Sequence, residues 1–238
     1  GFFADKHGWD LVVDDLLIVH KETNKLYPHI PKILLGHSMG SWIGLSALQR
    51  EEFFDAVLLS GSSYPNSLDK FLQKLLLKIE ILRLGSKGYS KLLHKIIFGG
   101  FNSQFINTRT QNDWLSLDID RVDDYTSDSL CGFVVSNQLW LDLINGIEDV
   151  FNKQNIGIIK KNVPILVFSG SDDPVGKMGK GTKKLHDCLV KNNCRSELYL
   201  IEGARHETLN EISRMSTYNY ILSFLKSNLH GAKVGSRK

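Results

Sequence analysis

The pattern of apolar positions predicts a helix, a strand and a second helix in the first part of the chain. Apolar side chains first recur at three- and four-residue steps, which places one apolar stripe on a helix. The residues of this stripe are Trp9, Val12, Val13, Leu16, Leu17 and His20. The wholly apolar run 33–35 is typical of a buried parallel strand, and a sharp turn over 36–40 leads into a helix at 42–49.

Three more apolar runs, at 56–59, 164–168 and 197–201, predict further strands. Helices are expected at 182–190 and 210–225, after the third and the fourth strand. Strands that alternate with helices along a chain favour a parallel sheet with right-handed crossovers. The fold class that this order predicts is therefore α/β, with a parallel sheet flanked by helices.

The stretch between the second and third predicted strands has a different pattern, of helices and loops without an obvious strand. The chain accordingly divides into a core part at 1–63, a helical cap or lid insertion at 64–160 and a second core part at 161–238. The insertion is expected to sit above the carboxyl ends of the strands. A length of 238 residues, 42% of them apolar, suits one domain that carries such an insertion.

A G-x-S-x-G pentapeptide occupies the turn at 36–40, between a predicted buried strand and a predicted helix. In this context the turn holds Ser38 in a strained backbone conformation, and the flanking glycines leave room for the close turn. The Ser38 hydroxyl then projects above the sheet as a nucleophile, while the backbone N–H of Met39 faces the oxyanion of an acyl intermediate. The pentapeptide alone is weak evidence, and its place between strand and helix gives it weight.

A serine hydroxyl needs a base, and the base needs a carboxylate that orients it. The sequence supplies both after later predicted strands, because Asp172 and Asp173 follow the third strand and His206 follows the fourth. The order serine, acid, histidine, each at the carboxyl end of a strand, is one known arrangement of a catalytic triad. One of the two aspartates is expected to cap a helix before Pro174, and the spacing leaves open which one.

Several stretches around these residues resemble the monoacylglycerol lipase and lysophospholipase branch of the α/β-hydrolases, which is related to the serine aminopeptidase-like group. The matching stretches are 36–41, 170–175 and 202–207, with 109–116 and 128–133 in the insertion. In the family's G-S-x-D pattern the fourth residue is the acid, so the resemblance selects Asp173. It implies an α/β-hydrolase fold with a mostly helical cap insertion and a catalytic triad of Ser38, Asp173 and His206.

Members of this family begin with several further strands, and a His-Gly loop among them gives a second oxyanion donor. The corresponding residues would precede Gly1. The resemblance therefore implies that the N-terminal strands are missing and that the chain is an N-terminally truncated fragment, which is itself a weak enzyme or an inactive one. The run 33–35 would then lie at an exposed sheet edge, which favours aggregation.

The segment 68–84 is helical by pattern, with apolar residues on two adjacent ridges. The predicted core-facing ridge comprises Leu68, Phe71, Leu72, Leu75, Leu76 and Ile79. The second ridge comprises Leu77, Ile81 and Leu84, and the remaining positions carry Lys70, Lys74 and Lys78. Either the helix packs on two sides within the cap, or the second ridge stays exposed and suits a lipid interface or an acyl chain.

These features predict a serine carboxylic-ester hydrolase that acts on acylglycerols or lysophospholipids through an acyl-enzyme, without a cofactor and without a metal. An aminopeptidase-type serine hydrolase is the nearest alternative. It needs acidic groups near the site to hold a substrate ammonium, whereas 66–100 carries seven lysines and arginines against two carboxylates. A catalytically dead binding protein on the same fold is a third interpretation, and the intact Ser38, Asp173 and His206 argue against it.

Composition and charge limit the partners that the sequence predicts. A net charge of +3 gives no reason to expect nucleic acid, so the expected partner is a small-molecule lipid ester, with transient membrane-surface contact through the basic cap helix. Cys131, Cys188 and Cys194 form no C-x-x-C pair, so a disulfide framework is not expected. Reduced thiols suit a cytoplasmic protein. No apolar run reaches the roughly 20 residues of a membrane-spanning helix.

Overall fold

The computed structural model describes residues 1–50 and 54–229, without the side chains of 67–70. The residues outside the description, 51–53 and 230–238, belong to the two predicted core parts. The strands are β1 (Ile33–His37), β2 (Ala56–Ser60), β3 (Ile165–Gly170) and β4 (Ser196–Ile201). All pairs are parallel, and the order across the sheet is β1-β2-β3-β4. The sheet confirms the predicted α/β fold and its four predicted strands.

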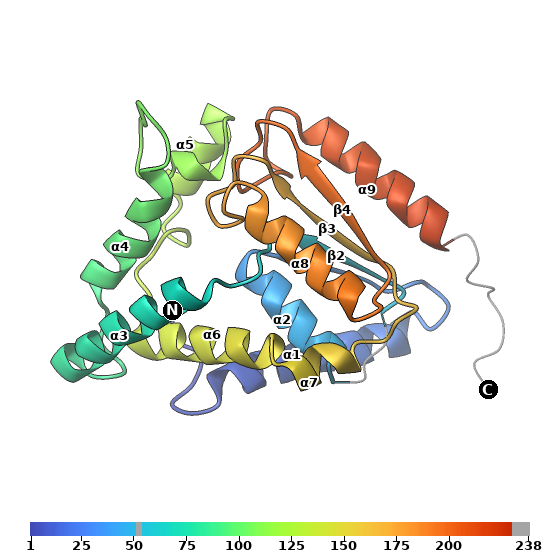
Figure 1. The fold of residues 1–238 in the computed structure, drawn as a ribbon, viewed down its shortest axis with the longest axis horizontal. Coiled ribbons are helices and arrows are strands. Elements are labelled where there is room, and N and C mark those ends of the chain that lie inside the picture. Colours follow the sequence, from blue (N-terminus) through green and yellow to red (C-terminus); the bar gives the residue numbers. More distant parts are fainter. Residues whose placement is uncertain (51–53, 230–238) are drawn as a thin grey trace.

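The two central strands are buried on both faces, because helices cover each side of the sheet (Figure 1). These helices are α1 (Gly8–Leu26), α2 (Met39–Leu48), α8 (Lys180–Lys191) and α9 (Arg214–Leu229). The face toward α1, α2 and α8 carries Val57, Leu59, Ile165 and Val167. The face toward α9 carries Ala56, Leu58, Leu166 and Phe168. Alternate residues thus enter different cores, which explains why both strands are apolar throughout.

Between β2 and β3 the described chain forms helices and loops. The elements are α3 (Ser67–Leu84), α4 (Lys91–Asn102), the 3-10 helix η1 (Asp113–Leu115), α5 (Ile119–Ser127), α6 (Asn137–Val150) and α7 (Lys153–Ile158). In Figure 1, α3, α4 and α5 stand beside the sheet, whereas α6 lies along α1 and α2 and contacts both. The segment predicted as one insertion therefore has an outer part and an inner part. Within the described residues, no helix has the length and apolar character needed to cross a membrane.

The face of α3 that packs inward differs from the predicted one. Leu77, on the second ridge, is 1% exposed and packs with Leu93 of α4 and with Trp140 and Ile144 of α6. Four residues of the predicted core-facing ridge are instead exposed, namely Phe71, Leu72, Leu75 and Ile79. Leu76 of the first ridge and Ile81 of the second are partly buried against this cluster of Leu77, Leu93, Trp140 and Ile144. Outside the described side chains lie Leu68 and Lys70. Leu84, also on the second ridge, is 39% exposed. The predicted assignment was therefore wrong for Leu77 and for the four exposed residues of the first ridge.

Polar contacts explain why α3 packs with Leu77 toward α4 and α6. The Glu80 carboxylate is 2% exposed, and it accepts hydrogen bonds from the Ser90 hydroxyl at 2.5 Å and from the Arg83 guanidinium at 2.6 Å. Lys74 forms an ion pair with Glu148 on α6. A buried carboxylate is stable only beside donors, and one of them is Ser90, the N-cap residue of α4, the helix whose Leu93 packs against Leu77. The apolar pattern could not separate two adjacent ridges, because it carries no information on such contacts.

β1 is an edge strand of the described sheet, as predicted for the run 33–35. Its side chains alternate in exposure, since Ile33 and Leu35 are 40% and 45% exposed while Leu34 is buried. Exposed apolar residues on an unpaired edge are unusual, because such an edge can pair with another chain. The carboxyl end of this strand leads directly into the candidate site.

Candidate active site

Ser38 lies in the turn between β1 and α2, in a strained backbone conformation with φ 52° and ψ −120°. Non-glycine residues seldom adopt a positive φ, so the surrounding structure must hold the turn. The Ser38 N–H donates to the Ser60 carbonyl of β2 at 2.9 Å. Gly36 approaches Gly40 so closely that a Cβ at position 36 would collide with the Gly40 carbonyl. The pentapeptide therefore forms a sharp strand-to-helix turn with Ser38 at its apex.

Asp173 and His206 meet beyond the carboxyl ends of β3 and β4. The distance from His206 Nδ1 to Asp173 Oδ1 is 3.1 Å, and both side chains are buried. The Asp173 carboxylate also accepts hydrogen bonds from the Ser169 hydroxyl at 2.5 Å and from the Val175 N–H at 2.8 Å. Asp172 is exposed. The aspartate that faces the imidazole is thus Asp173, the one that the G-S-x-D pattern selects.

Burial and charge oppose each other in this pair. Burial favours a neutral Asp173 carboxyl, but the charge and hydrogen bond of His206, with the bonds from Ser169 and Val175, lower its pKa below the ordinary value. Burial also favours a neutral His206, but the carboxylates of Asp173 and Glu207 raise its pKa above the ordinary value. The arrangement therefore stabilises a protonated imidazole beside an ionised carboxylate, as a serine nucleophile requires of its base.

Among the described residues, no hydrogen bond joins the serine to the acid–histidine pair. The ring centroids of His37 and His206, by contrast, lie 4.6 Å apart. Contacts between a nucleophile and its base are often longer without substrate. The structure thus joins Asp173 to His206 directly, and it packs His37, the residue before Ser38, against the His206 ring.

A cavity of about 500 Å³ lies at Ser38. Aromatic and aliphatic side chains from α2, α4 and α6 dominate its wall, among them Trp42, Ile97, Phe98, Leu139, Trp140, Leu143, Ile144 and Ile147. No Asp or Glu belongs to the described residues that line it. Met39 lines the cavity too, and as the first residue of α2 its N–H has no acceptor within the helix. The cavity can bury an apolar chain next to the Ser38 hydroxyl.

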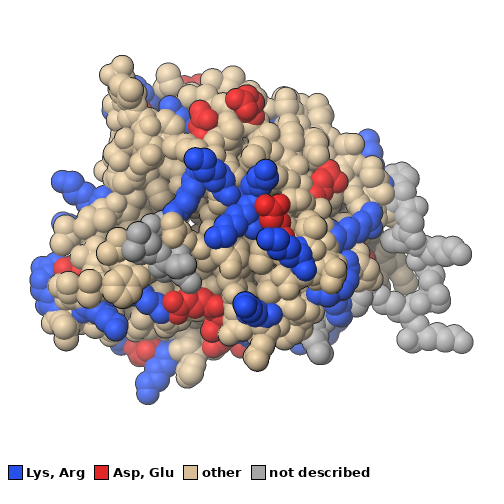
Figure 2. Space-filling model, in the orientation of Figure 1, with Lys and Arg blue, Asp and Glu red and all other residues tan. Residues whose placement is uncertain are grey.

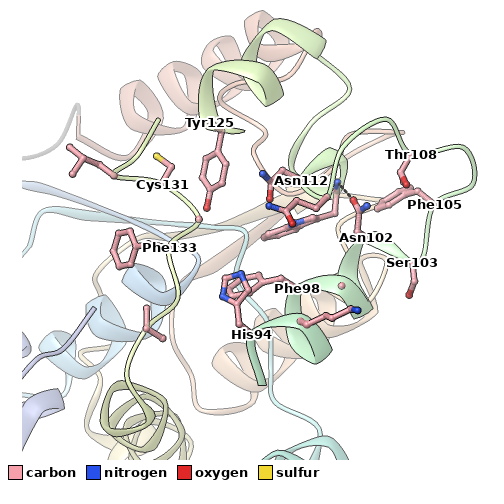
Figure 3. A pocket seen from close by; sticks show the side chains of 17 residues that line it. His94, Phe98, Asn102, Ser103, Phe105, Thr108, Asn112, Tyr125, Cys131 and Phe133 are labelled. Atoms are coloured by element: carbon pink, nitrogen blue, oxygen red, sulfur yellow. Dashed lines mark hydrogen bonds between the residues drawn. The ribbon is translucent and has the colours of Figure 1, made fainter. Parts of the chain in front are cut away.

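The outer part of the insertion encloses a second cavity, of about 820 Å³. His94 from α4 and Tyr125 from α5 extend toward it from opposite sides (Figure 3). Both cavities are lined by Phe98, Trp114, Phe133 and Val135. The Trp114 ring also lies 5.1 Å from the His206 ring, centroid to centroid. The residues that line both cavities therefore include one, Trp114, that contacts the candidate base His206.

Residues 113–118 of the insertion are bound closely to the loop that carries His206, which we call the histidine loop (202–213). The Glu207 N–H donates to the Leu115 carbonyl at 2.7 Å. The Leu117 N–H lies 3.1 Å from both carboxylate oxygens of Glu211, which is 1% exposed. Further contacts join Arg205 to the Asp113 carbonyl and Ser116 to the Asn210 carbonyl, and Arg214, the first residue of α9, pairs with the Asp118 carboxylate. These bonds fix Trp114 above His206.

Sequence reasoning missed the residues that surround His206, namely His37, Gly61, Trp114 and Glu207. Two of them stand next to a predicted site residue, since His37 precedes Ser38 and Glu207 follows His206. That adjacency was the available signal. Trp114 lies within the matching stretch 109–116 but was given no role there, and nothing in the pattern singled out Gly61. As for metal sites, the described residues contain no group of three or more His, Cys, Asp or Glu side chains placed to hold an ion.

Comparisons with known proteins extend this picture. The family described as serine aminopeptidase, S33, matches residues 3–213. A carboxyl esterase from Bacillus coagulans, solved with glycerol, has a TM-score of 0.84 at 24% identity, over 96% of this chain and 74% of that chain. A lipase in an open form has a TM-score of 0.82 at 23% identity, over 93% and 73%. A soluble variant of monoglyceride lipase from Saccharomyces cerevisiae, solved with a substrate analog, has a TM-score of 0.64 at 19% identity, over 94% and 70%.

No curated protein matches the chain. At these identities the solved structures show the fold, which is that of the α/β-hydrolases and agrees with the parallel sheet. The family match covers most of the chain and includes Ser38, Asp173 and His206. The chain therefore belongs to the serine aminopeptidase S33 family of α/β-hydrolases.

Proposed function

We propose that this protein is a serine carboxylic-ester hydrolase that acts on acylglycerols or lysophospholipids. The observation that carries the proposal is the apolar cavity of about 500 Å³ at Ser38, beside the buried pair of Asp173 and His206. Such a cavity suits a fatty-acyl chain, because it removes apolar surface from water and has few polar groups to satisfy. The carboxyl esterase and the monoglyceride lipase of similar fold are compatible with this substrate class.

In the proposed reaction, the Ser38 hydroxyl attacks the acyl carbonyl while His206 accepts its proton at Nε2. The His206 Nδ1–H donates to Asp173, which holds the ring in this tautomer. The N–H of Met39 stabilises the oxyanion of the tetrahedral intermediate. The imidazolium then protonates the leaving alcohol, and a water molecule activated by His206 releases the acyl group from Ser38. No step needs a cofactor or a metal ion.

The nearest alternative is the aminopeptidase activity in the family's description. An enzyme that cleaves an amino-terminal residue must hold the substrate ammonium, and a carboxylate is the usual partner for such a charge. Among the described residues, neither cavity is lined by an Asp or Glu, and the larger one is lined by Lys95. This charge distribution supports an ester substrate over an aminoacyl amide. A catalytically dead protein would have no need of a buried Asp173–His206 pair.

A serine-directed fluorophosphonate probe and a panel of acyl esters and aminoacyl amides test the proposal together. The protein should be labelled and should prefer long-chain acyl esters, and Ser38→Ala should lose both labelling and turnover. Ser223→Ala, at an exposed serine of α9, is the matched control and should behave as the parent. Labelling that survives in Ser38→Ala would show that another serine reacts. Faster turnover of aminoacyl amides than of esters would favour the aminopeptidase.

We also infer transient contact with a lipid surface through the outer face of α3. The exposed apolar residues on this helix are Phe71, Leu72, Leu75, Ile79 and Leu82. Lys78 is exposed beside them, and Lys and Arg side chains gather at this end of the molecule (left in Figure 2). Apolar side chains next to lysines suit the boundary between acyl chains and anionic headgroups. Ile97 and Phe98 of the neighbouring helix α4 line the Ser38 cavity, which brings this surface close to the substrate site.

A further inference from the structure

Two aromatic rings contact the imidazole of His206, and they come from different parts of the fold. His37, from the turn that carries Ser38, lies 4.6 Å from it with an interplanar angle of 49°. Trp114, from η1, lies 5.1 Å away with an interplanar angle of 35°. The position of the candidate base therefore depends on what holds these two rings.

Glu207, the residue after His206, contacts His37 and Leu115. Its carboxylate lies 3.1 Å from His37 Nε2 and accepts a hydrogen bond from the Asn210 amide at 2.7 Å. Its backbone N–H donates to the carbonyl of Leu115, the neighbour of Trp114, at 2.7 Å. The side chains of His37 and Glu207 are only 30% and 23% exposed, so bulk water competes weakly with their contact.

The remaining contacts leave the two imidazoles little freedom. His37 Nδ1 lies 3.2 Å from the Ser60 hydroxyl at the end of β2. Both rings pack on the backbone of Gly61, where a Cβ would lie 2.7 Å from His206 Cε1 and 3.0 Å from His37 Cε1. The His37 ring is thus fixed at both nitrogens and at its edge, and it bounds the space that His206 occupies.

We propose that Glu207 is a positioning residue for His206, acting through His37, which contacts the imidazole, and through the Leu115 carbonyl, and hence Trp114, which contacts it too. The inference rests on the proposed function in that it takes His206 as the catalytic base. Asp173 holds the ring at Nδ1, and Glu207 sets its tilt and its charge environment. No pattern in the sequence assigned a role to either His37 or Glu207.

The charges around this pair give Glu207 an effect on the basicity of His206. Facing His206 are the carboxylates of Asp173 and Glu207 and the imidazole of His37, and Glu207 also faces Tyr125 and Cys131. Burial would raise the pKa of Glu207, but the hydrogen bond and charge of His37 lower it to about 2. Glu207 is therefore ionised whenever the enzyme works, and its negative charge stabilises the protonated form of His206.

Removal of this charge moves the pKa of His206 downward. The acidic limb of kcat/KM reports the pKa of the base in the free enzyme, since only the neutral imidazole accepts the proton of Ser38. In Glu207→Gln we expect that limb to move to lower pH by roughly 0.5–1 pH unit. We also expect kcat to fall roughly ten- to a hundred-fold, because the neutral Gln amide holds His37 more weakly than the carboxylate does and His206 is then less well positioned.

The test compares the parent, Glu207→Gln and Glu202→Gln on a short soluble p-nitrophenyl ester between about pH 4 and pH 9. Glu202 is exposed on the same loop, so its variant removes the same charge without touching His206, and it should match the parent. Glu207→Asp keeps the charge but shortens the side chain, so it should lose turnover without a shift of the limb. An unshifted limb in Glu207→Gln, an equal shift in Glu202→Gln, or full turnover in Glu207→Asp would overturn the proposal.

A second measurement separates this inference from the proposed function. The pKa of His206 can be followed in the whole protein by NMR titration of its ring proton, whether or not any ester is hydrolysed. Should the parent turn over no ester, the proposed function fails, while a lower His206 pKa in Glu207→Gln still supports the positioning role. Should the parent be active but the His206 pKa be the same in both proteins, the positioning role fails alone.

Discussion

At the scale of single residues, the candidate site depends on a glycine outside the catalytic loops. Gly61 has φ 57°, and a Cβ there would lie 2.7 Å from the His206 ring. Gly61→Ala therefore adds backbone strain and a clash that must displace His206, the proposed base. We expect turnover to fall by about a hundred-fold or more, together with a loss of about 2–4 kcal/mol in unfolding free energy. Ester hydrolysis and urea denaturation measure the two effects.

Gly203→Ala is the matched control for this prediction. Gly203 also has a positive φ, 67°, but no heavy atom lies within 4 Å of the position of its Cβ. Its substitution should cost only the backbone strain, about 1–2 kcal/mol, and should leave turnover near that of the parent. Equal losses of turnover in the two variants would mean that the space between Gly61 and His206 is not what the base requires.

The carboxyl group of Glu207 also makes the free energy of unfolding depend on pH in the acid range. Its pKa is lowered from 4.5 to about 2 in the folded protein, because the contact with His37 outweighs the effect of burial. A carboxyl with a depressed folded pKa contributes stability that is present above its unfolded pKa and is lost as pH falls through the folded value. This contribution should therefore disappear between about pH 4.5 and about pH 2, and it amounts to at most about 3 kcal/mol.

Urea unfolding at several pH values measures this contribution as a difference between variants. The parent should lose more stability across the acid range than Glu207→Gln does, since the variant has no carboxyl to titrate at this position. Glu202→Gln, with its exposed site, should follow the parent. Parallel curves for the parent and Glu207→Gln would contradict the depressed pKa.

At the scale of elements, the orientation of α3 predicts opposite outcomes for two leucines on one helix. Leu77 is 1% exposed within the cluster formed with α4 and α6, whereas Leu82 is 89% exposed. Leu77→Ala should cost about 2–4 kcal/mol because it leaves a cavity, and Leu82→Ala should cost less than about 0.5 kcal/mol. Denaturant unfolding of both variants checks this. Similar costs at both positions would mean that α3 packs through its other face.

The exposed face of α3 gives the prediction for lipid surfaces. Replacing Leu75 and Ile79 together by Gln should weaken binding to vesicles of anionic phospholipid by about ten-fold, because it removes apolar surface that the lipid would bury. Activity on an aggregated long-chain ester should fall more than activity on a short soluble ester. Leu222→Gln, at a residue of α9 that is 52% exposed, should change neither. Equal losses on both esters would assign this face to the packing of the cap alone.

The sequence predicted the elements of the sheet better than the packing of the cap. β2 and β3 are apolar throughout because they are buried on both faces, and that pattern identifies them without further information. α3 has two adjacent apolar ridges, and its buried side is chosen by Glu80, Ser90 and the ion pair of Lys74 with Glu148. Ser90 and Glu148 lie outside α3, at the start of α4 and on α6, so their positions beside this helix follow only from the assembled fold.

At the scale of the whole molecule, the parallel sheet explains how much of the site the sequence could predict. Parallel strands bring their carboxyl ends to one edge, so residues that follow successive strands come together whatever their separation in the chain. This is why the order of the strands predicts that His206 and one of the two aspartates at 172 and 173 lie at the same sheet edge as Ser38, while the choice of Asp173 came from the family's G-S-x-D pattern. Trp114 approaches His206 from the insertion, and no such rule fixes the path of that segment. The contact between Trp114 and His206 therefore could not be predicted from the sequence.

The bonds between residues 113–118 and the histidine loop join parts of the chain that are 94 residues apart at Leu117 and Glu211. Closing so long a loop costs more conformational entropy than forming a local helix, so this junction should form late in folding. Once formed, this junction should open only when the whole fold unfolds.

The amide protons of Leu117 and Glu207 should then exchange with deuterium as slowly as that of Leu58 in β2, while those of α3 exchange faster. Exchange at the same rate in α3 and at Leu117 would instead indicate a cap that opens as one body. If α3 opens more often than this junction does, the outer helices of the cap can open many times to admit substrate while residues 113–118 stay in contact with the histidine loop.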